Sequence, residues 1–250
     1  MSWIPNLFTT INLMGGVVAM CLCVDGKPFE AGLAVMFGYL LGDTLDGFLA
    51  RKLKVQNAFG GEFDTIADHS SHVIAPSVIV YTVYKDVGIL PAPWNKVLAM
   101  ALAGSMVLAV AVRHARNIVK PVSFKGVWVG LPRTVLGFAA LAYCNASLAP
   151  YAPGGWWLGV VLFPFASFTT LTYWPFPSHH LTRGLRPAAV TAALIALFSS
   201  IAIAVFKREF FFDLLFFWMA GYAMSAWMSL NDEERKAYRA TVAAARAVKT

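Results

Sequence analysis

The chain has 250 residues, of which 58% are hydrophobic and only 13% are charged. Soluble domains average about 45–50% apolar and about 25% charged residues, so this composition excludes an ordinary soluble domain. The net charge of +7 does not predict nucleic-acid binding, because no basic stripe with interleaved aromatics lies outside the apolar stretches; basic loops facing anionic lipid account for it.

Apolar stretches of about 20 residues follow one another along the chain, and short connectors containing Gly and Pro separate them. No soluble domain fits between any two of them. We therefore predict an all-α, polytopic transmembrane bundle over residues 1–230, with about eight spans, and a polar cytoplasmic tail over residues 231–250. The spans are expected at residues 7–24, 29–50, 62–84, 94–114, 127–147, 156–174, 187–206 and 210–230.

The distribution of basic residues predicts the orientation of this bundle. With an even number of spans, both termini lie on the same side of the membrane. Placing them in the cytoplasm puts fourteen of the twenty Lys and Arg residues in cytoplasmic loops and the tail, and five on the other side. Arg133 lies within a predicted span. Since cytoplasmic loops are enriched in Lys and Arg, we expect both termini in the cytoplasm.

Four acidic residues lie close together in apolar sequence. Asp43 and Asp46 belong to the second predicted span, and Asp64 and Asp68 belong to the third. A carboxylate inside a bilayer costs about 2.5–3.5 kcal/mol on insertion scales, so acids placed there are expected to be functional. Any one of them alone could instead belong to an ion pathway or to a buried pair.

The spacing of these acids predicts that they converge. Asp43, Asp46 and Gly47 share one helix face, and Asp64 and Asp68, four residues apart, share a face of the next helix. The loop between the helices is short, so the two faces can meet near the cytoplasmic edge of the membrane. The converging carboxylates would need cations, and an oxygen-only ligand set favours Mg²⁺, Mn²⁺ or Ca²⁺ over zinc.

Two glycines and an arginine accompany the acids. Gly47 and Gly60 lack side chains, which lets a flat base or a diphosphate approach the backbone. Arg51 lies at the end of the predicted loop, where its guanidinium could pair with phosphate oxygens. Taken singly, the glycines could be packing notches and Arg51 a topology signal. Together with the acids they predict a site for a nucleotide diphosphate.

These residues form one continuous pattern, and it resembles the signature of the CDP-alcohol phosphotransferases at all eight defining positions. The resemblance implies a six-helix transmembrane core, a homodimer, and transfer of a lipid phosphoryl group from a CDP-linked lipid to an alcohol with release of CMP. The pattern reads Asp43-x2-Asp46-Gly47-x2-Ala50-Arg51-x8-Gly60-x3-Asp64-x3-Asp68.

The same resemblance implies a role for each position. Asp43, Asp46 and Asp64 are expected to bind divalent metal, with Mg²⁺ or Mn²⁺ favoured and Ca²⁺ as an alternative. Asp68 is expected to be the general base, with a further contact to the metal. The cytidine and diphosphate pocket is expected to contain Gly47, Ala50, Arg51, Gly60 and Asn12.

Within this family the chain most resembles the integral-membrane phosphatidylserine synthases. This implies L-serine as acceptor, CDP-diacylglycerol or CDP-archaeol as donor, and the cytoplasmic membrane of a prokaryote. Two departures bear on the acceptor: Asn117 follows Arg116 directly, and His72-Val73 replace a frequent Phe-Gly pair. The segments that carry the resemblance are residues 5–9 with Asn12, the run ending in Ala75-Pro76, Arg113-x-x-Arg116 with Gly130-Leu131-Pro132, and residues 174–178.

A serine acceptor would need a cation for its carboxylate, and three arginines are candidates: Arg113, Arg116 and Arg133. The first two could equally be anchors that follow the positive-inside rule. His69 and His72 flank Asp68 and are either hydrogen-bond partners of the site or packing histidines.

The sequence leaves two alternatives open. Another member of the family would use glycerol phosphate or inositol phosphate as acceptor, and it should have a denser basic pocket. A cation-coupled transporter would use the same acids in another way, and it should have a through-going polar path with acids on distant helices.

Overall fold

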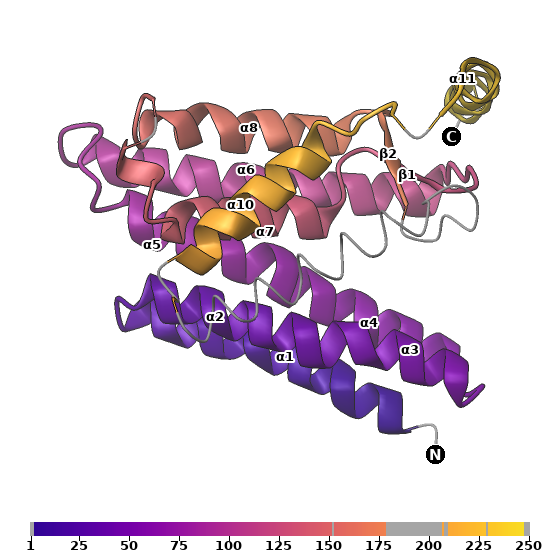
Figure 1. Cartoon of the computed structure of the whole chain (residues 1–250), viewed down its shortest axis with the longest axis horizontal. Helices are drawn as coiled ribbons and strands as arrows, with labels where there is room; N and C mark the ends of the chain where they lie inside the picture. The colour runs from indigo at the N-terminus through magenta and orange to yellow at the C-terminus, as the bar shows by residue number, and fades with distance from the viewer. Residues whose placement is uncertain (1–2, 152, 179–206, 208–209, 229, 248–250) are drawn as a thin grey trace.

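The computed structural model describes residues 3–151, 153–178, 207, 210–228 and 230–247. The predicted span over residues 187–206 lies outside these described residues. The described chain is mainly helical, as expected (Figure 1). Its α-helices are α1 (Trp3–Val24), α2 (Pro28–Gly38), α3 (Thr44–Lys52), α4 (Ala58–His69), α5 (Ala75–Tyr84), α6 (Trp94–Val119), α7 (Arg133–Asn145), α8 (Trp157–Leu171), α10 (Phe211–Ala223) and α11 (Asp232–Ala247).

Two pairs of helices are joined without a break by π-helical turns. Tyr39–Asp43 connects α2 to α3, and Ser70–Ile74 connects α4 to α5. A π-helical turn adds one residue to the helical repeat and rotates the faces that follow it, and such turns are frequent at functional sites. Both turns lie beside the acidic residues, because Asp43 ends the first and Asp68 precedes the second by two positions.

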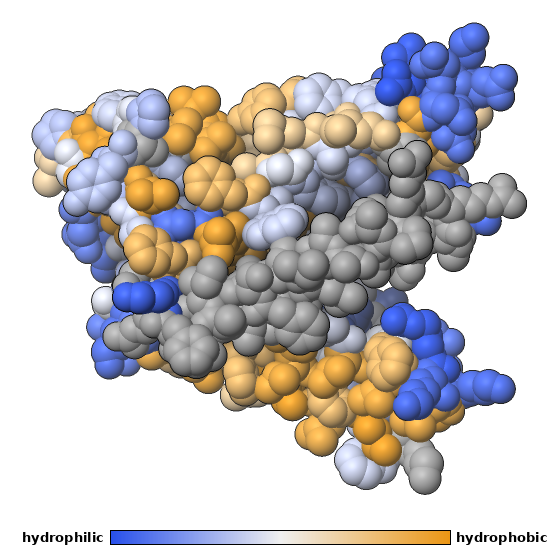
Figure 2. Space-filling view, in the orientation of Figure 1, coloured by the Kyte–Doolittle hydropathy of each residue, from blue (hydrophilic) through white to orange (hydrophobic). Residues whose placement is uncertain are grey.

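Three helices of the described chain are long and apolar enough to cross a membrane: Trp3–Val24, Pro28–Lys52 and Trp94–Val119. Helices α8 and α10 are apolar but shorter. Apolar side chains cover the outer surface over α1–α3, as Figure 2 shows. The exposed residues there include Leu7, Met14, Val18, Phe37, Leu41 and Phe48. A helical membrane protein fits these features, whereas the total of eight spans and the six-helix core remain predictions.

The helices form two groups that share one hydrophobic core, to which α1, α2, α5–α8 and α10 contribute. Helix α1 packs against α2, α3 and α4, while α5 packs on α6 and α7, and α7 packs on α8 and α10 (Figure 1). At one end of the second group, the hydroxyl of Tyr84 donates to the Trp156 carbonyl at 2.9 Å and that of Tyr143 donates to the Gly155 carbonyl at 2.6 Å. These bonds satisfy two hydroxyls whose aromatic rings lie deep in the core.

The prediction of an all-α fold needs one correction. Strands β1 (Val127–Val129) and β2 (Pro175–Pro177) pair antiparallel, with Val127 opposite Pro177 and Val129 opposite Pro175. The Val-Trp-Val sequence of β1 has the β-branched and aromatic residues that favour strands. The prolines of β2 are tolerated because this sheet has only two strands, so each strand is an edge.

The predicted helix over residues 127–147 was therefore wrong at its start. Pro132 directly precedes α7, which occupies only Arg133–Asn145. Proline disfavours the helical conformation of the residue before it, so a helix starts readily just after it but does not extend through it. Consequently Arg133 is the first residue of α7 rather than a residue inside a span.

The segment expected as a polar tail is an amphipathic helix, α11. Its buried face contains Tyr238 and Val242, which pack with Val127 and Val129 of β1. Figure 1 shows α11 end-on beside the lengthwise views of α6 and α8, so its axis crosses theirs. It lies at the end of the bundle that also carries β1 and β2.

Candidate active site

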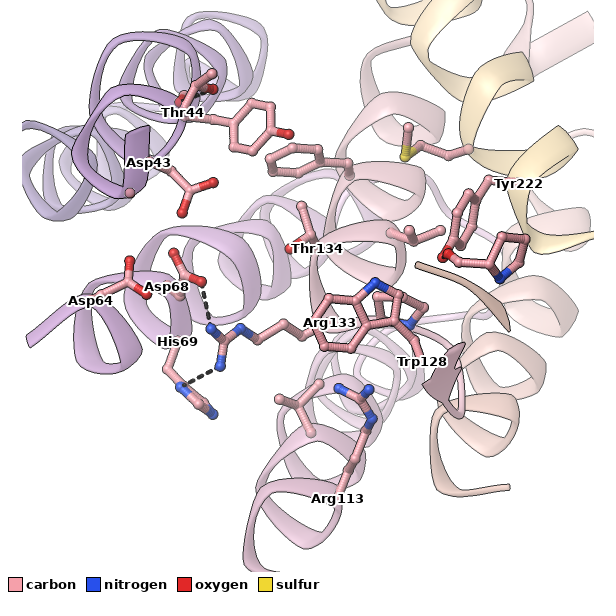
Figure 3. Close-up of a pocket in the computed structure, with 18 of the residues that line it drawn as sticks. Asp43, Thr44, Asp64, Asp68, His69, Arg113, Trp128, Arg133, Thr134 and Tyr222 are labelled. Atoms are coloured by element: carbon pink, nitrogen blue, oxygen red, sulfur yellow. Dashed lines mark hydrogen bonds and ion pairs between the residues drawn. The ribbon is translucent and has the colours of Figure 1, made fainter. Parts of the chain in front are cut away.

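A cavity of about 1170 Å³ opens between the first helix group and helices α6, α7 and α10. The four aspartates Asp43, Asp46, Asp64 and Asp68 lie on one of its walls. Arg113, Trp128, Arg133 and Tyr222 lie around the facing wall (Figure 3). Much of the remaining lining is apolar and consists of residues such as Met36, Leu40, Val135, Phe138, Leu215 and Met219. The cavity thus combines a compact acidic wall, guanidinium groups and space for an apolar ligand.

The structure brings the predicted acids together. One carboxylate oxygen from each of Asp43, Asp46 and Asp64 lies within 4.8 Å of the other two. A second group of the same size contains Asp43, Asp68 and His72. Asp43 ends the first π-helical turn, Asp46 lies in the first turn of α3, and the other two acids lie on α4. The faces of two neighbouring helices therefore meet, as the spacing predicted.

The first of these groups fits a hard divalent cation. Its three donors are all carboxylate oxygens, which is the ligand chemistry of Mg²⁺, Mn²⁺ and Ca²⁺. Oδ1 of Asp64 is buried and has no hydrogen-bond partner among the described residues. A buried acceptor without a partner is costly, and a cation would satisfy it. Asp43, Asp46 and Asp64 are thus suited to hold the metal.

Asp46 is oriented by Thr9, to which the sequence pattern assigned no role. Oγ1 of Thr9, on α1, donates to Oδ2 of Asp46 at 2.7 Å, and the backbone N–H of Gly47 donates to Oδ1 at 2.5 Å. Both Asp46 and Thr9 are buried. Thr9 lies in the opening segment that carries part of the family resemblance, and this was its only signal in the sequence.

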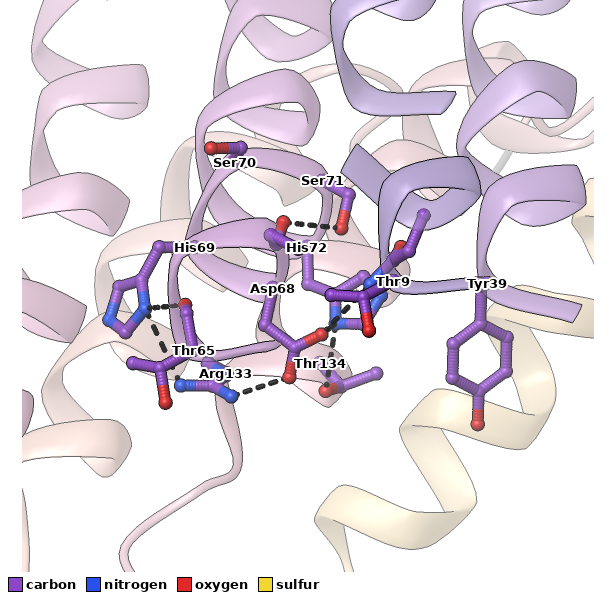
Figure 4. Close-up of polar contacts among 12 residues, drawn as sticks. Thr9, Tyr39, Thr65, Asp68, His69, Ser70, Ser71, His72, Arg133 and Thr134 are labelled. Atoms are coloured by element: carbon purple, nitrogen blue, oxygen red, sulfur yellow. Dashed lines mark hydrogen bonds and ion pairs between the residues drawn. The ribbon is translucent and has the colours of Figure 1, made fainter. Parts of the chain in front are cut away.

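Asp68 has a different environment, shown in Figure 4. Its Oδ1 accepts a hydrogen bond from Nδ2 of Asn12 at 3.0 Å, and its Oδ2 accepts one from Nη2 of Arg133 at 2.5 Å. Nδ1 of His72 lies 3.4 Å from Oδ1. Three side chains from α1, α7 and the second π-helical turn therefore hold this carboxylate, whereas Asp64 has an oxygen without a partner.

Only some of the residues expected to bind the nucleotide lie at the cavity. Gly47 and Arg51 line the cavity, whereas Ala50, Gly60 and Asn12 are not among its lining residues. Asn12 is fully buried and points to Asp68 instead. Its position depends on Gly42, because a Cβ at Gly42 would collide with the backbone nitrogen of Asn12.

The three candidate acceptor arginines also differ. Arg133 and Arg113 line the cavity, and Nε of Arg113 donates to the Val129 carbonyl at 3.2 Å. Arg116 is not a lining residue: its Nη1 donates to the Leu171 carbonyl at 2.6 Å, and its guanidinium lies 4.5 Å from the centre of the Tyr173 ring. Arg116 thus binds the end of α8, and the other two remain candidates for the acceptor.

The two histidines beside Asp68 have separate roles. Nδ1 of His69 lies 2.7 Å from the Thr65 carbonyl, so we assign the proton to Nδ1; this histidine lines the cavity, with its ring 4.7 Å from that of His114. His72 is fully buried, and its ring packs edge-on against Tyr39 and Phe138 at 5.5 and 5.1 Å. His72 is therefore both a packing residue and a neighbour of Asp68.

The protein has apolar helices long enough to cross a membrane. It also has a cavity whose acidic wall could hold a metal ion. These features indicate an integral membrane protein with a candidate active site. Comparison with known proteins identifies the class: the family described as CDP-alcohol phosphatidyltransferase matches residues 2–171. The chain belongs to this family. The predicted class of transferase is thereby confirmed.

Similar proteins have names within the same chemistry. The chain is 24% identical over 205 residues to a CDP-diacylglycerol–serine O-phosphatidyltransferase of Mycobacterium leprae, covering 80% of this chain and 67% of that protein. A Helicobacter pylori protein of the same name is 31% identical over 129 residues, covering 49% and 51%. An archaetidylserine synthase of Methanothermobacter thermautotrophicus is 31% identical over 85 residues, covering 33% and 36%. The chain thus spans about one third to two thirds of the length of these relatives.

Proposed function

We propose that this protein transfers a phosphatidyl or archaetidyl group from a CDP-linked lipid to L-serine and releases CMP. The observation that carries the proposal is the convergence of Asp43, Asp46 and Asp64 on one wall of a cavity that has Arg113 and Arg133 on its facing wall. The diphosphate of a CDP-linked lipid would lie against the acidic wall and its metal, and the apolar chains of the lipid would lie against the apolar lining. Relatives named for transfer to serine support the choice of acceptor.

The reaction exchanges one phosphorus–oxygen bond for another. The serine hydroxyl oxygen forms a bond to the phosphorus that bears the lipid. The bond from that phosphorus to the bridging oxygen of the diphosphate breaks, and CMP leaves with the electron pair. The hydroxyl proton passes to a carboxylate, for which we propose Asp68, because it is the acid nearest the guanidinium of Arg133.

The metal site proposed here contains Asp43, Asp46 and Asp64. A bound divalent cation would supply charge neutralisation for the diphosphate and for the leaving CMP. Arg51, at the exposed end of α3, would bind phosphate oxygens, and Gly47, which also lines the cavity, would let the diphosphate approach beside Asp46. Thr9 keeps the Asp46 carboxylate in position for this purpose.

In this proposal, the guanidinium of Arg133 can bind either the carboxylate of the serine acceptor or that of Asp68, the proposed base. Its guanidinium is bound to Asp68, and its Nη1 lies 3.5 Å from Nδ1 of His69, whose proton is directed to the Thr65 carbonyl (Figure 3). A serine carboxylate entering the cavity would compete with Asp68 for this guanidinium, since Arg binds carboxylates in paired geometry. Release of Asp68 from Arg133 would then coincide with arrival of the hydroxyl that it deprotonates.

The alternatives have less support. A phosphate-bearing acceptor needs more positive charge, and the Arg and Lys residues among the described lining of the cavity are Arg51, Arg113 and Arg133. A cation-coupled transporter was expected to have its acids on distant helices, whereas these acids lie together. We also propose that the active site and both termini face the cytoplasm, as the distribution of Lys and Arg predicts, and that the protein acts as a homodimer, as the family resemblance implies.

The test uses the purified full chain in detergent with CDP-diacylglycerol or CDP-archaeol. The divalent metal is removed with EDTA, and Mg²⁺, Mn²⁺ or Ca²⁺ is then restored singly. CMP release is measured with serine, glycerol phosphate or inositol phosphate as acceptor. We expect release only with lipid, metal and serine together. Release with glycerol phosphate but not serine would overturn the acceptor, and no release under any combination would overturn the reaction.

A further inference from the structure

A second cavity, of about 880 Å³, lies between the end of α8 and helix α11, far along the sequence from the aspartates. It shares no lining residue with the first cavity. Phe168 and residues 171–174 form one side, and Trp227 with one face of α11 forms the other. The family resemblance gave no role to the tail that contains α11. The cavity is therefore a candidate for a second ligand.

Positive charge dominates this second cavity. Arg239 and Arg246 line it, and no acidic residue lines it among the described residues. The guanidinium of Arg246 lies 4.3 Å from the centre of the Tyr173 ring, and that of Arg239 lies 5.3 Å from the centre of the Trp227 ring. The acids of α11 are confined to its first turn. The cavity is thus complementary to an anion, and the aromatic rings help to hold the two guanidinium groups in position.

The apolar part of the cavity distinguishes a lipid from a soluble anion. Phe168 of α8 is 61% exposed and Trp174 is 40% exposed, so this side of the cavity continues onto the apolar outer surface of α8. Figure 2 shows the hydrophilic surface of α11 beside a surface over α8 of mixed, mostly weak hydropathy. Because α11 crosses the bundle axis, we expect it to lie along the membrane surface, where basic residues favour headgroups and aromatic residues favour the acyl boundary.

Trp227 is held in an unusual backbone conformation at this site. Its φ of +69° lies in the left-handed region, which a bulky residue rarely adopts. Its N–H donates to the Pro175 carbonyl of β2 at 2.9 Å, and its ring packs edge-on against Tyr238. Backbone strain of this kind persists only where the surroundings fix it, and it is concentrated at functional sites. Here it places the ring beneath Arg239.

We propose that this cavity binds the headgroup phosphate of an anionic phospholipid, with Arg239 and Arg246 on the phosphate and the lipid chains running along Phe168. The site is independent of the transfer reaction, because none of its residues lines the catalytic cavity. Tyr238 and Val242 of α11 pack on β1, whose Val127 also lines the catalytic cavity. The bound lipid would therefore lie one strand away from the active site.

The test counts lipids bound to the full chain in nonionic detergent by native mass spectrometry. Phosphatidylglycerol and phosphatidylcholine are titrated in parallel. We expect the protein to retain one more phosphatidylglycerol than phosphatidylcholine. Arg246→Gln should weaken that binding about fivefold, the effect of one basic residue near an anionic lipid surface. Arg246→Lys should retain most of it, which controls for folding.

Lys236→Gln is the matched control, because it removes one positive charge from the same helix but does not line the cavity. It should leave phosphatidylglycerol binding unchanged. Equal binding of the two lipids, or equal losses in Arg246→Gln and Lys236→Gln, would overturn the proposal. Displacement of the lipid by millimolar glycerol phosphate would show a free-anion site and would also overturn it. Lipid in the catalytic cavity is distinguished because Arg246→Gln should not affect it.

Discussion

Arg133 and Asp68 form an ion pair in which Nη2 lies 2.5 Å from Oδ2. The two residues are 65 positions apart in sequence and come from α7 and α4. Their side chains are 23% and 10% exposed, so water screens the pair only weakly. This contact joins the second helix group to the acidic wall of the first. It also brings Arg133, which we propose binds the serine carboxylate, into contact with Asp68, the proposed general base.

Replacement of Arg133 tests that relationship directly. Arg133→Ala should raise the KM for serine at least tenfold and lower kcat, because a charge-assisted hydrogen bond is worth about 1.5–3 kcal/mol. Arg133→Lys keeps the charge without the paired donors and should give an intermediate KM. Both are measured by CMP release at saturating CDP-linked lipid. An unchanged KM for serine, with only the melting temperature lowered, would make Arg133 a structural link alone.

Arg116 provides the contrasting case. The sequence made Arg116 a candidate for binding the serine carboxylate, as it did Arg133. In the structure, however, its guanidinium binds the Leu171 carbonyl at the end of α8 and lies over the Tyr173 ring. Arg116→Ala should therefore lower the free energy of unfolding by about 1–3 kcal/mol while the KM for serine stays within twofold. Thermal unfolding and CMP release are measured on the same preparation. A tenfold rise in that KM would place Arg116 in the acceptor pocket.

The convergence of the acids could be predicted because it depends on local periodicity. Asp64 and Asp68 are one helical turn apart, and the short connection to α3 limits where the other pair can lie. The partners of these acids could not be predicted in this way, since Asn12 and Thr9 reach them from α1 across 56 and 37 residues. Such contacts depend on tertiary packing, which no spacing rule encodes.

Short irregular segments account for the remaining differences. The π-helical turns at Tyr39–Asp43 and Ser70–Ile74 lie inside apolar stretches that read as continuous α-helix. The strands Val127–Val129 and Pro175–Pro177 are each three residues long. The first was included in the predicted span over residues 127–147, and the prolines of the second were interpreted as helix breakers. Hydrophobicity identifies burial at these positions, but it does not distinguish a short strand from the start of a helix.

Thr9 should control metal affinity through Asp46. Thr9→Val removes the hydroxyl that donates to Oδ2 of Asp46, and loss of such an orienting partner typically costs 10–100-fold in metal affinity. We expect the Mn²⁺ concentration for half-maximal CMP release to rise by about that factor, with Thr9→Ser close to the native chain. Direct Mn²⁺ binding is measured by electron paramagnetic resonance.

The neighbouring Thr10 is the control for this experiment. Its hydroxyl donates to the Asn6 carbonyl on the same helix at 2.8 Å and does not contact an acid. Thr10→Val should therefore leave the Mn²⁺ dependence unchanged. If both variants shift it equally, the effect belongs to α1 in general and not to the Thr9–Asp46 hydrogen bond.

Asp64 can be compared with an acid two positions earlier on the same helix. Asp64→Asn should abolish Mn²⁺ binding and lower CMP release by at least about 100-fold, because it removes the carboxylate with the unpartnered buried oxygen. Glu62 is exposed and does not line the cavity, so Glu62→Gln should have near-native activity. Native Mn²⁺ affinity in Asp64→Asn would exclude this carboxylate as a metal ligand.

The contact between α7 and the second π-helical turn should set the distance between Arg133 and Asp68. Gly137 lies one turn after Arg133, and a Cβ there would collide with the carbonyl oxygen of His72 and approach Cγ of Pro76 at 3.2 Å. Gly137→Ala should destabilise the protein by about 1–3 kcal/mol through overpacking. It should also reduce CMP release, because moving α7 withdraws the guanidinium from the acidic wall.

Gly104→Ala is the control for the gain in helix propensity that a Gly→Ala substitution causes in any helix. A Cβ at Gly104, in α6, would meet nothing within 4 Å, so the substitution should be neutral or stabilising by up to about 1 kcal/mol. The two variants are compared by melting temperature and by CMP release per folded molecule. Gly137→Ala with native turnover per folded molecule would show that the helix contact stabilises the fold without positioning Arg133. A loss of turnover among folded molecules, absent in Gly104→Ala, would show that close packing of α7 holds the two charged groups together.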